Sequence, residues 1–202
     1  MTKKPDEPSA DEGPGQWADT ADIFSRYWRA HGGIRVVLTS PYLHVALLLS
    51  ILLAPHWLRN PWYNDAIAVL PNIVGFAIAG YAIWTGWADE RFRDILLKAE
   101  VRPNVSVYLH VSATFAHFAV IQLIALLYAL ACKGLIFDPS EPSVWTDLFF
   151  QLRLPLDYFA WLAIPGRGIG FFLFVYALLL ALEATIELFR IASWFQRFHS
   201  RK

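Results

Sequence analysis

Four long apolar stretches constrain the fold of this chain more than any other feature of its sequence. They cover residues 41–58, 66–88, 103–132 and 168–189, and the first three contain no Lys, Arg, Asp or Glu. An α-helix rises about 1.5 Å per residue and the hydrocarbon core of a bilayer is about 30 Å thick, so each stretch is long enough, or nearly so, to cross it. The sequence therefore predicts an all-α integral membrane protein, a four-helix bundle.

The distribution of Lys and Arg predicts the orientation of this bundle. Basic residues cluster before the first stretch, between the second and third, and after the fourth, as Arg26, Arg29, Arg35, Arg91, Arg93, Lys98, Arg102, Arg190, Arg197, Arg201 and Lys202. The opposite side carries only Arg59, Lys133, Arg153 and Arg167. Because short loops rich in Lys and Arg stay in the cytoplasm, we expect both termini to be cytoplasmic.

Composition supports the same class of protein. The chain is 56% hydrophobic and 17% charged over 202 residues, which is unusual for a soluble domain. Its net charge is zero, so no general attraction to nucleic acid is implied. The single cysteine, Cys132, excludes an internal disulfide and leaves two interpretations, a small buried apolar residue or an intersubunit disulfide.

The segments before and between the stretches carry their own signals. Residues 1–20 are rich in Asp, Glu, Pro and Gly and predict a disordered tail. Residues 21–40 alternate apolar side chains with arginines and predict a cytoplasmic amphipathic helix that lies in the membrane interface. Residues 89–100 predict a second cytoplasmic helix, with Phe92 and Leu96 on its apolar face.

The transmembrane domain is expected to cover residues 41–202 and to include one sizeable outer segment, residues 135–166. Within this segment, residues 144–164 mix aromatic side chains with three charges and a proline, which makes a full crossing costly. We expect a broken helix in the outer interface. The alternative is a re-entrant loop that lines a pathway.

Small residues recur along one face of the second stretch. They are Ala68, Gly75, Ala79, Ala82 and Gly86, and their offsets of about seven, four, three and four place them in one stripe of a helix. In lipid no hydrophobic force brings helices together, so small residues that allow close backbone approach determine the contacts. We expect this stripe to pack on another helix, either within the subunit or in a homo-oligomer.

Polar side chains within the first, third and fourth stretches form the candidate site. Ionisable groups are costly inside a membrane, so they suggest function by default. We expect an inner-leaflet cluster made of His44, His110, Thr114, His117, Glu183 and Glu187. This cluster either conducts protons or ions, or it has only a structural role in which its side chains form hydrogen bonds between helices. No His and Glu spacing typical of a metal site occurs in the spans, so no metal is expected.

Motifs of known enzymes are absent, including His-Glu-x-x-His, Gly-x-Ser-x-Gly and phosphate-binding glycine loops. We therefore expect no enzymatic activity and no cofactor. The run LPNIVGFAIAGYAIWTGWADERFR, residues 70–93, is similar to segments of uncharacterised bacterial inner-membrane proteins. In length and number of spans, the chain also resembles the small four-span membrane subunits of bacterial antiviral defence systems, such as that of Kiwa. This resemblance covers layout rather than motifs, so no residue role follows from it.

Two functions are consistent with these features. The first is a non-enzymatic, homo-oligomeric module of the bacterial inner membrane that acts with a cytoplasmic protein partner, as a sensor, an anchor or a membrane-perturbing effector. Its motivation is the small-residue stripe and the amphipathic cytoplasmic segments. The alternative is a small ion channel or proton-coupled transporter that uses the His/Glu cluster. In both cases the bilayer is a partner and nucleic acid is not.

Overall fold

The computed structural model describes residues 15–86, 89–135, 151 and 156–200. The described chain is almost entirely helical. Its helices are α1 (Gln16–His31), α2 (Gly33–Thr39), α3 (Pro41–Leu52), α4 (Ala54–Arg59), α5 (Tyr63–Gly86), α6 (Glu90–Lys98), α7 (Val107–Leu135) and α9 (Leu156–His199), with two short strands, β1 (Glu100–Arg102) and β2 (Val105–Ser106).

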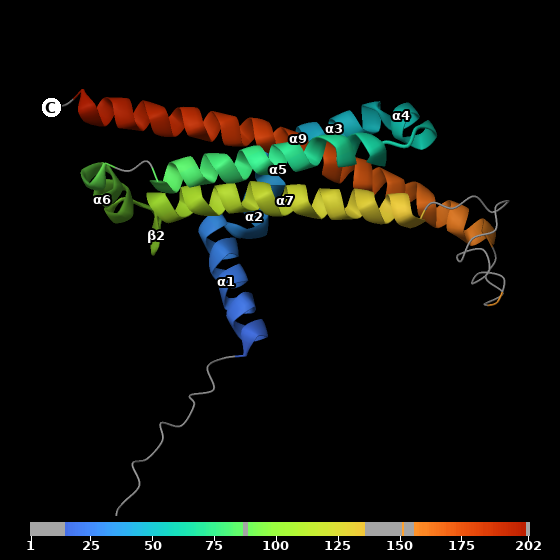
Figure 1. The fold of residues 1–202 in the computed structure, drawn as a ribbon, viewed down its shortest axis with the longest axis horizontal. Coiled ribbons are helices and arrows are strands. Elements are labelled where there is room, and N and C mark those ends of the chain that lie inside the picture. The colour runs from blue at the N-terminus through green and yellow to red at the C-terminus, as the bar shows by residue number, and fades with distance from the viewer. Residues whose placement is uncertain (1–14, 87–88, 136–150, 152–155, 201–202) are drawn as a thin grey trace, which may run out of the picture.

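Three helices, α5, α7 and α9, are long and apolar enough to cross a membrane. They run along the long axis of the molecule and pack side by side (Figure 1). The number of crossings rises to four if α2 and α3, which are bent by 53° at a short break, form one span. The described fold is therefore a multi-pass helical membrane bundle, as the sequence predicts.

The predicted first span, residues 41–58, is divided into two helices. α3 has 12 residues and ends at a turn at Leu53, after which α4 begins. Pro55, in the first turn of α4, lacks the N–H that a continuous helix would need there. α3 alone rises about 18 Å, which is too short to cross the hydrocarbon core. A single straight helix over this region was the wrong expectation.

The predicted third span begins four residues too early. Residues 100–106 form an antiparallel hairpin in which Glu100 pairs with Ser106, and α7 starts at Val107. Asn104 adopts φ 61°, a left-handed turn conformation that Asn tolerates better than most residues. The Ser106 hydroxyl then accepts a hydrogen bond from the backbone N–H of Leu109 and caps the helix.

Two other boundaries also differ from the predictions. α1 begins at Gln16, inside the predicted disordered tail, because its apolar spacing extends back to Trp17. α9 has 44 residues and continues through Pro165, so residues 156–166 of the predicted outer segment belong to it. Residues 136–150 and 152–155 lie outside the described residues, as do residues 87–88 at the end of the predicted second span.

The core lies where α5, α7 and α9 pack against one another. Phe115 and Phe118 of α7 are almost fully buried there. Farther along the bundle, Gly170 of α9 permits a close approach, since a Cβ at this position would lie 2.5 Å from Tyr128 and 2.6 Å from Trp62. Trp62 is fully buried in this contact.

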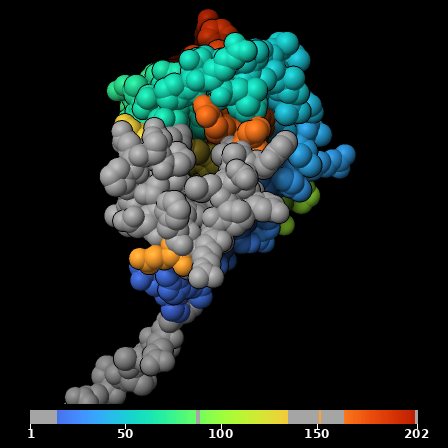
Figure 2. All heavy atoms as spheres, turned by 90° about the vertical axis from the view of Figure 1, so that its right-hand side faces the viewer, coloured from blue at the N-terminus to red at the C-terminus, as the bar shows by residue number. Residues whose placement is uncertain are grey.

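The two ends of the bundle differ, and each is named here after the helix found there. At the α6 end, α6 and the hairpin lie beside the C-terminal part of α9, and α4 lies at the opposite, α4 end (Figure 1). α6 buries Phe92 and Leu96, as its predicted apolar face requires. α1 extends away from the bundle, across its long axis, and stands beyond the outline of the bundle when viewed from the α4 end (Figures 1 and 2).

Candidate functional site: the contact between α1 and α7

The predicted polar residues of α7 face the last turn of α1. His110 donates from Nδ1 to the carbonyl oxygen of Ala30 at 3.0 Å. The Thr114 hydroxyl donates to the carbonyl oxygen of His110 at 2.9 Å and is buried. His117, two turns beyond His110, is only 3% exposed. These three residues therefore belong to one site, and α1 covers it.

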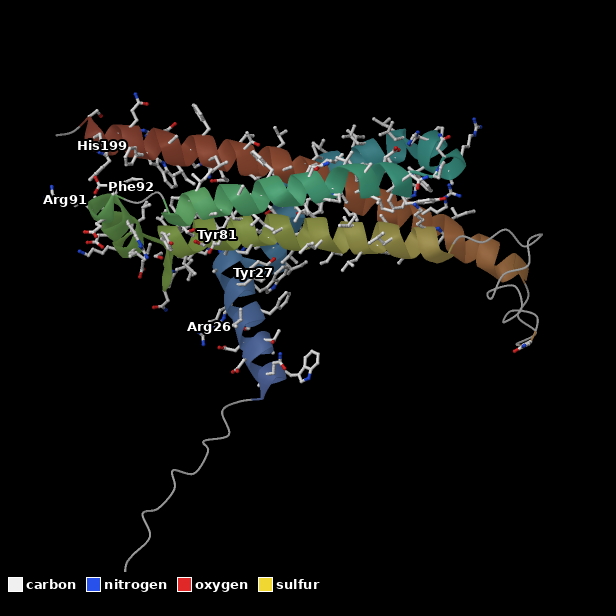
Figure 3. All side chains as sticks on the ribbon, viewed as in Figure 1. Arg26, Tyr27, Tyr81, Arg91, Phe92 and His199 are labelled. Atoms are coloured by element: carbon white, nitrogen blue, oxygen red, sulfur yellow. The ribbon has the colours of Figure 1, made fainter. Side chains whose placement is uncertain are left out.

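Two residues of α1, Tyr27 and His31, complete the site. The His31 and His117 rings stack with centroids 4.1 Å apart and planes 17° apart. The Tyr27 hydroxyl lies 2.8 Å from Nδ1 of His117 and forms a hydrogen bond with it. Figure 3 shows Tyr27 and Arg26 on different sides of α1, with Tyr27 toward α7. We call Tyr27, His31, His110 and His117 the histidine contact.

Tyr27 and His31 were not among the site residues predicted from the sequence. The available signal was His31 at the end of the amphipathic segment, beside Gly32 and Gly33. Periodicity within α7 cannot show that a separate helix brings a histidine onto it. Gly32 makes this approach possible, because it ends α1 with φ 114° and its Cα lies against Arg102.

Each stacked imidazole keeps one buried nitrogen without a hydrogen-bond partner in the described part of the chain. These atoms are Nδ1 of His31 and Nε2 of His117. A buried polar atom without a partner costs roughly 1–3 kcal/mol. Both rings are therefore held in place by stacking and by their neighbours rather than by a complete set of hydrogen bonds.

The electrostatic environment of His31 favours its neutral form. Burial, together with the nearby charges of His110 and Arg102, lowers the pKa of His31 from 6.5 to about 4. Arg102 also donates to the carbonyl oxygen of His31 at 3.3 Å. Burial raises the pKa of Tyr27, so its hydroxyl remains protonated. At neutral pH His31 and Tyr27 are thus uncharged, and Arg102 lies at the edge of the contact.

The other three members of the predicted cluster lie elsewhere. His44 is on α3, where its Nδ1 donates to the carbonyl oxygen of Ser40 at 2.7 Å. Glu187 pairs with Arg190 at 2.8 Å on the same helix, α9. Glu183 is half-buried and interacts electrostatically with Tyr42 of α3. The structure therefore distributes the predicted inner-leaflet cluster over three helices, with His44 on α3, the other histidines and Thr114 on α7, and the carboxylates on α9.

The small-residue stripe of α5 is exposed in the subunit. Its residues are Ala68, Gly75, Ala79, Ala82 and Gly86. A Cβ built at Gly75 or Gly86 meets no described atom within 4 Å. α5 packs on α7 and α9 through the opposite face, which includes Leu70, Ala77 and Gly80. Of the two expected contacts, the one within the subunit is absent from the described structure.

Asn72 lies on the same exposed face, four residues after Ala68 and three before Gly75. Its Nδ2 donates to the carbonyl oxygen of Ala68 at 3.3 Å. This is a polar amide on the outer surface of an apolar, membrane-spanning helix, where uncovered polar groups are costly.

A second buried amide lies inside the bundle. Gln122 of α7 is fully buried, and neither atom of its amide has a hydrogen-bond partner in the described part of the chain. It lies on the face of α7 that also buries Phe118 and Ala125, so apolar side chains surround it. Gln122 can be recognised in the sequence, since it interrupts an otherwise apolar run.

A shallow pocket opens at the α6 end and is mostly aromatic. Its lining residues are Trp84, Phe92, Arg93, Leu96, Tyr108, Ile191 and Phe195. The Arg93 guanidinium lies over the Tyr108 ring at 5.5 Å, a cation–π contact. His199 of α9 lies 3.7 Å from Asp89, which caps α6, so the end of α9 and α6 are held together around the pocket (Figure 3).

The residues that the structure describes include no group of three or more His, Cys, Asp or Glu side chains placed to hold a metal ion. Fold and site together define a multi-pass helical membrane protein with a histidine-linked amphipathic helix. Comparisons of the chain with protein-family models, with curated proteins and with solved structures gave no match.

Proposed function

We propose that this chain is a non-enzymatic membrane module that assembles with copies of itself along α5 and presents its α6 end to a partner protein. The exposed face of α5 is the observation that carries the proposal. α5 buries one face on α7, while the small residues of its opposite face are uncovered. Such residues let helix backbones approach closely in lipid. A helix of another copy would therefore fit this face.

Asn72 supports a second copy as the occupant of this face. An Asn side chain has both donors and an acceptor, so two Asn72 amides related by a two-fold axis can satisfy each other. The same contact removes both amides from lipid. A single polar residue in the seam of two packed helices also fixes their register. Asn72 thus supplies the register and the small residues supply the close packing.

Disulfide trapping in native membranes tests this assembly. We expect Ala79→Cys, in a Cys132→Ser background, to form a disulfide-linked dimer on oxidation, because cysteines pair only when their Cα atoms are within about 7 Å. Ala116→Cys is the matched control, since Ala116 is exposed on α7, away from this face. Equal cross-linking of the two variants would refute the interface. So would the absence of cross-linking in each of the single variants Gly75→Cys, Ala79→Cys and Ala82→Cys.

A bulky substitution gives an independent measurement. Gly75→Leu places a large side chain in the proposed seam, where overpacking costs about 1–3 kcal/mol. The subunit itself leaves space there, so its fold should persist. We expect the mass of the protein in nanodiscs to fall to that of a monomer, whereas Ala116→Leu keeps the oligomer. An unchanged mass for Gly75→Leu would contradict the proposal.

The wider role is part of the same proposal. The basic residues near the α6 end support a cytoplasmic location for this end of the bundle. Both termini would then also be cytoplasmic, in a protein of the bacterial inner membrane. The aromatic pocket with Arg93 offers a partner protein an apolar site with a positive edge. The layout shared with membrane subunits of antiviral defence systems supports a role there. Phage plating on cells that express the wild-type protein or Gly75→Leu tests that role. If the role is correct, the wild-type protein protects the cells and Gly75→Leu, which cannot assemble, does not.

The channel or transporter alternative stays a prediction. It needs the histidines and the glutamates in one cluster along one path. The histidines contact α1, and Glu187 pairs with Arg190 on α9. No observation on the described residues favours this alternative over the oligomeric module, and proton flux into proteoliposomes would test it directly.

A further inference from the structure

The helix α1 leaves most of its surface uncovered. Residues 15–26 are exposed, and contact with the bundle is confined to the last turns, around Tyr27, Ala30 and His31. Trp17 is 89% exposed and Phe24 is 56% exposed. An isolated helix with large uncovered aromatic residues needs an apolar partner, because exposed apolar patches mark interaction surfaces.

The two sides of α1 differ in chemistry. Trp17, Ala21, Phe24 and Trp28 follow one another at offsets of four, three and four, which places them on one side of the helix. The opposite side carries the charged residues Asp19, Asp22, Arg26 and Arg29, and Asp22 pairs with Arg26. Neither bulk water nor the hydrocarbon core suits both sides, whereas the bilayer interface does.

The direction of α1 agrees with this location. The spanning helices α5, α7 and α9 run along the long axis of the bundle, and α1 extends across that axis (Figure 1). A helix that lies across spanning helices runs along the membrane surface. α2 continues from α1 with further exposed apolar residues, Ile34 and Leu38. We propose that residues 16–39, the α1–α2 arm, bind the surface of the lipid bilayer and mark the level at which the bundle leaves the membrane.

The histidine contact fixes this level on α7. α1 is held against residues 110–117 by the stacked His31 and His117 rings and by the bond from His110 to Ala30. From His117 to Lys133, α7 rises about 24 Å. From Glu183 to Arg167, α9 spans the same length of about 24 Å. Arg167 bonds to the carbonyl oxygens of Trp57 and Asn60 near the α4 end.

These lengths are close to the thickness of the hydrocarbon core once the depth of the arm in the interface is included. Lys133 and Arg167 then lie at one boundary, and His117 and Glu183 lie at the other. Glu183 is therefore placed at the membrane surface, where its charge is tolerated, rather than inside the apolar core.

The rest of the α6 end stands outside the bilayer as a consequence. α9 continues beyond Glu183 to His199 for about 24 Å, and the start of α7 at Val107 lies about 15 Å beyond His117. The ion pair of Glu187 with Arg190 and the contact of His199 with Asp89 lie in this part. The aromatic pocket lies there as well. This part of the α6 end is thus accessible to proteins in the aqueous phase, whether or not the protein assembles through α5.

Spin labels on single cysteines, in the Cys132→Ser background, test whether the arm binds lipid. In nanodiscs of zwitterionic lipid we expect labels at Trp17→Cys and Ala21→Cys to collide with oxygen, which concentrates in lipid. A label at Arg26→Cys, on the charged side, should collide with a water-soluble nickel complex. If all three labels contact only the aqueous reagent, the arm does not bind the bilayer.

Lipid charge distinguishes an apolar contact from attraction to anionic headgroups. The charges on the arm nearly cancel, so adding anionic lipid should leave the label depths unchanged. Burial that occurs only with anionic lipid would overturn the apolar basis of the contact.

A membrane-impermeant maleimide tests the boundary itself. Leu109, Ala116 and Leu123 are exposed at seven-residue spacing along one face of α7. We expect Leu109→Cys to react from the aqueous phase with proteoliposomes made permeable to the reagent, and Leu123→Cys to be protected. Protection of Leu109→Cys would mean that the bilayer covers the whole of α7 and that the arm does not mark its surface. This outcome is independent of whether α5 forms an oligomer.

Discussion

Acidification should release α1 from α7, and His31 gives the size of the effect. The pKa of His31 is about 4 in the docked state, because burial disfavours its charge, and is 6.5 when the ring is free in water. Undocked protein therefore binds more protons between these values, and docking weakens as the pH falls through this window. The contribution of neutral His31 to the docking free energy is fully present above pH 6.5 and fully lost below about pH 4.

The magnitude follows from the two pKa values. A full shift between them corresponds to about 3 kcal/mol, and lowering the pH from 7.5 to 5 removes about 2 kcal/mol, roughly a 30-fold change in the docking equilibrium. The groups that face His31 do not offset this loss. His110 and Arg102 oppose a positive charge there, and Tyr27 contacts His117 and has a raised pKa. No carboxylate among the described residues pairs with His31.

Hydrogen exchange of the α1 amides in nanodiscs, at matched intrinsic exchange rates, measures this equilibrium. We expect exchange to increase between pH 7.5 and 5 in the wild-type protein. His31→Phe keeps a ring for stacking but removes the titrating group, so the pH response should be smaller than in the wild type. His44→Phe is the matched control, since His44 is exposed on α3 away from the contact, and its response should equal that of the wild type. A full response in His31→Phe would refute the assignment to His31.

Three further predictions concern orientation and packing. Alkaline phosphatase fused after Lys98 or after Lys202 should be inactive and fused after Ser140 active, because Arg91–Arg102 is the strongest cytoplasmic signal; activity at Lys98 would overturn the predicted orientation. Gln122→Leu should raise the thermal stability of the purified protein, by about 1–3 kcal/mol, since it removes a buried amide without partners in the described structure; a lower melting temperature would mean that the amide has a partner. Gly170→Ala should lower thermal stability by about 1–3 kcal/mol, because its Cβ would meet Tyr128 and Trp62 at 2.6 Å or less. Gly75→Ala is the control and should have little effect on the subunit, since its Cβ meets no described atom within 4 Å. Equal effects of the two variants would contradict the close packing at Gly170.

Much of the architecture is readable from the sequence because lipid imposes a simple rule. Backbone polar groups in hydrocarbon must be satisfied within the segment, so long uncharged stretches become helices. The stretches at residues 66–88, 103–132 and 168–189 accordingly correspond to α5, α7 and α9. The amphipathic spacing around Phe92 and Leu96 likewise gives the buried face of α6.

Local exceptions to this rule account for the wrong boundaries. Pro55 divides the first stretch into α3 and α4, and the Asn104 turn replaces the first residues of the third stretch by a hairpin. Both residue types were visible in the sequence. Apolar composition alone, however, does not distinguish one long helix from two short ones or from a turn.

Tertiary structure alone decides which polar and small residues meet. Periodicity places His110 and His117 on one face of α7, but only the docking of α1 brings His31 onto that face. Periodicity also identifies the stripe on α5, and only the packing of α5 against α7 shows that the stripe remains uncovered. A helical repeat defines the faces of one helix. Which faces of two helices meet depends on how distant segments of the chain pack in space, and the spacing of residues within one segment does not contain this information.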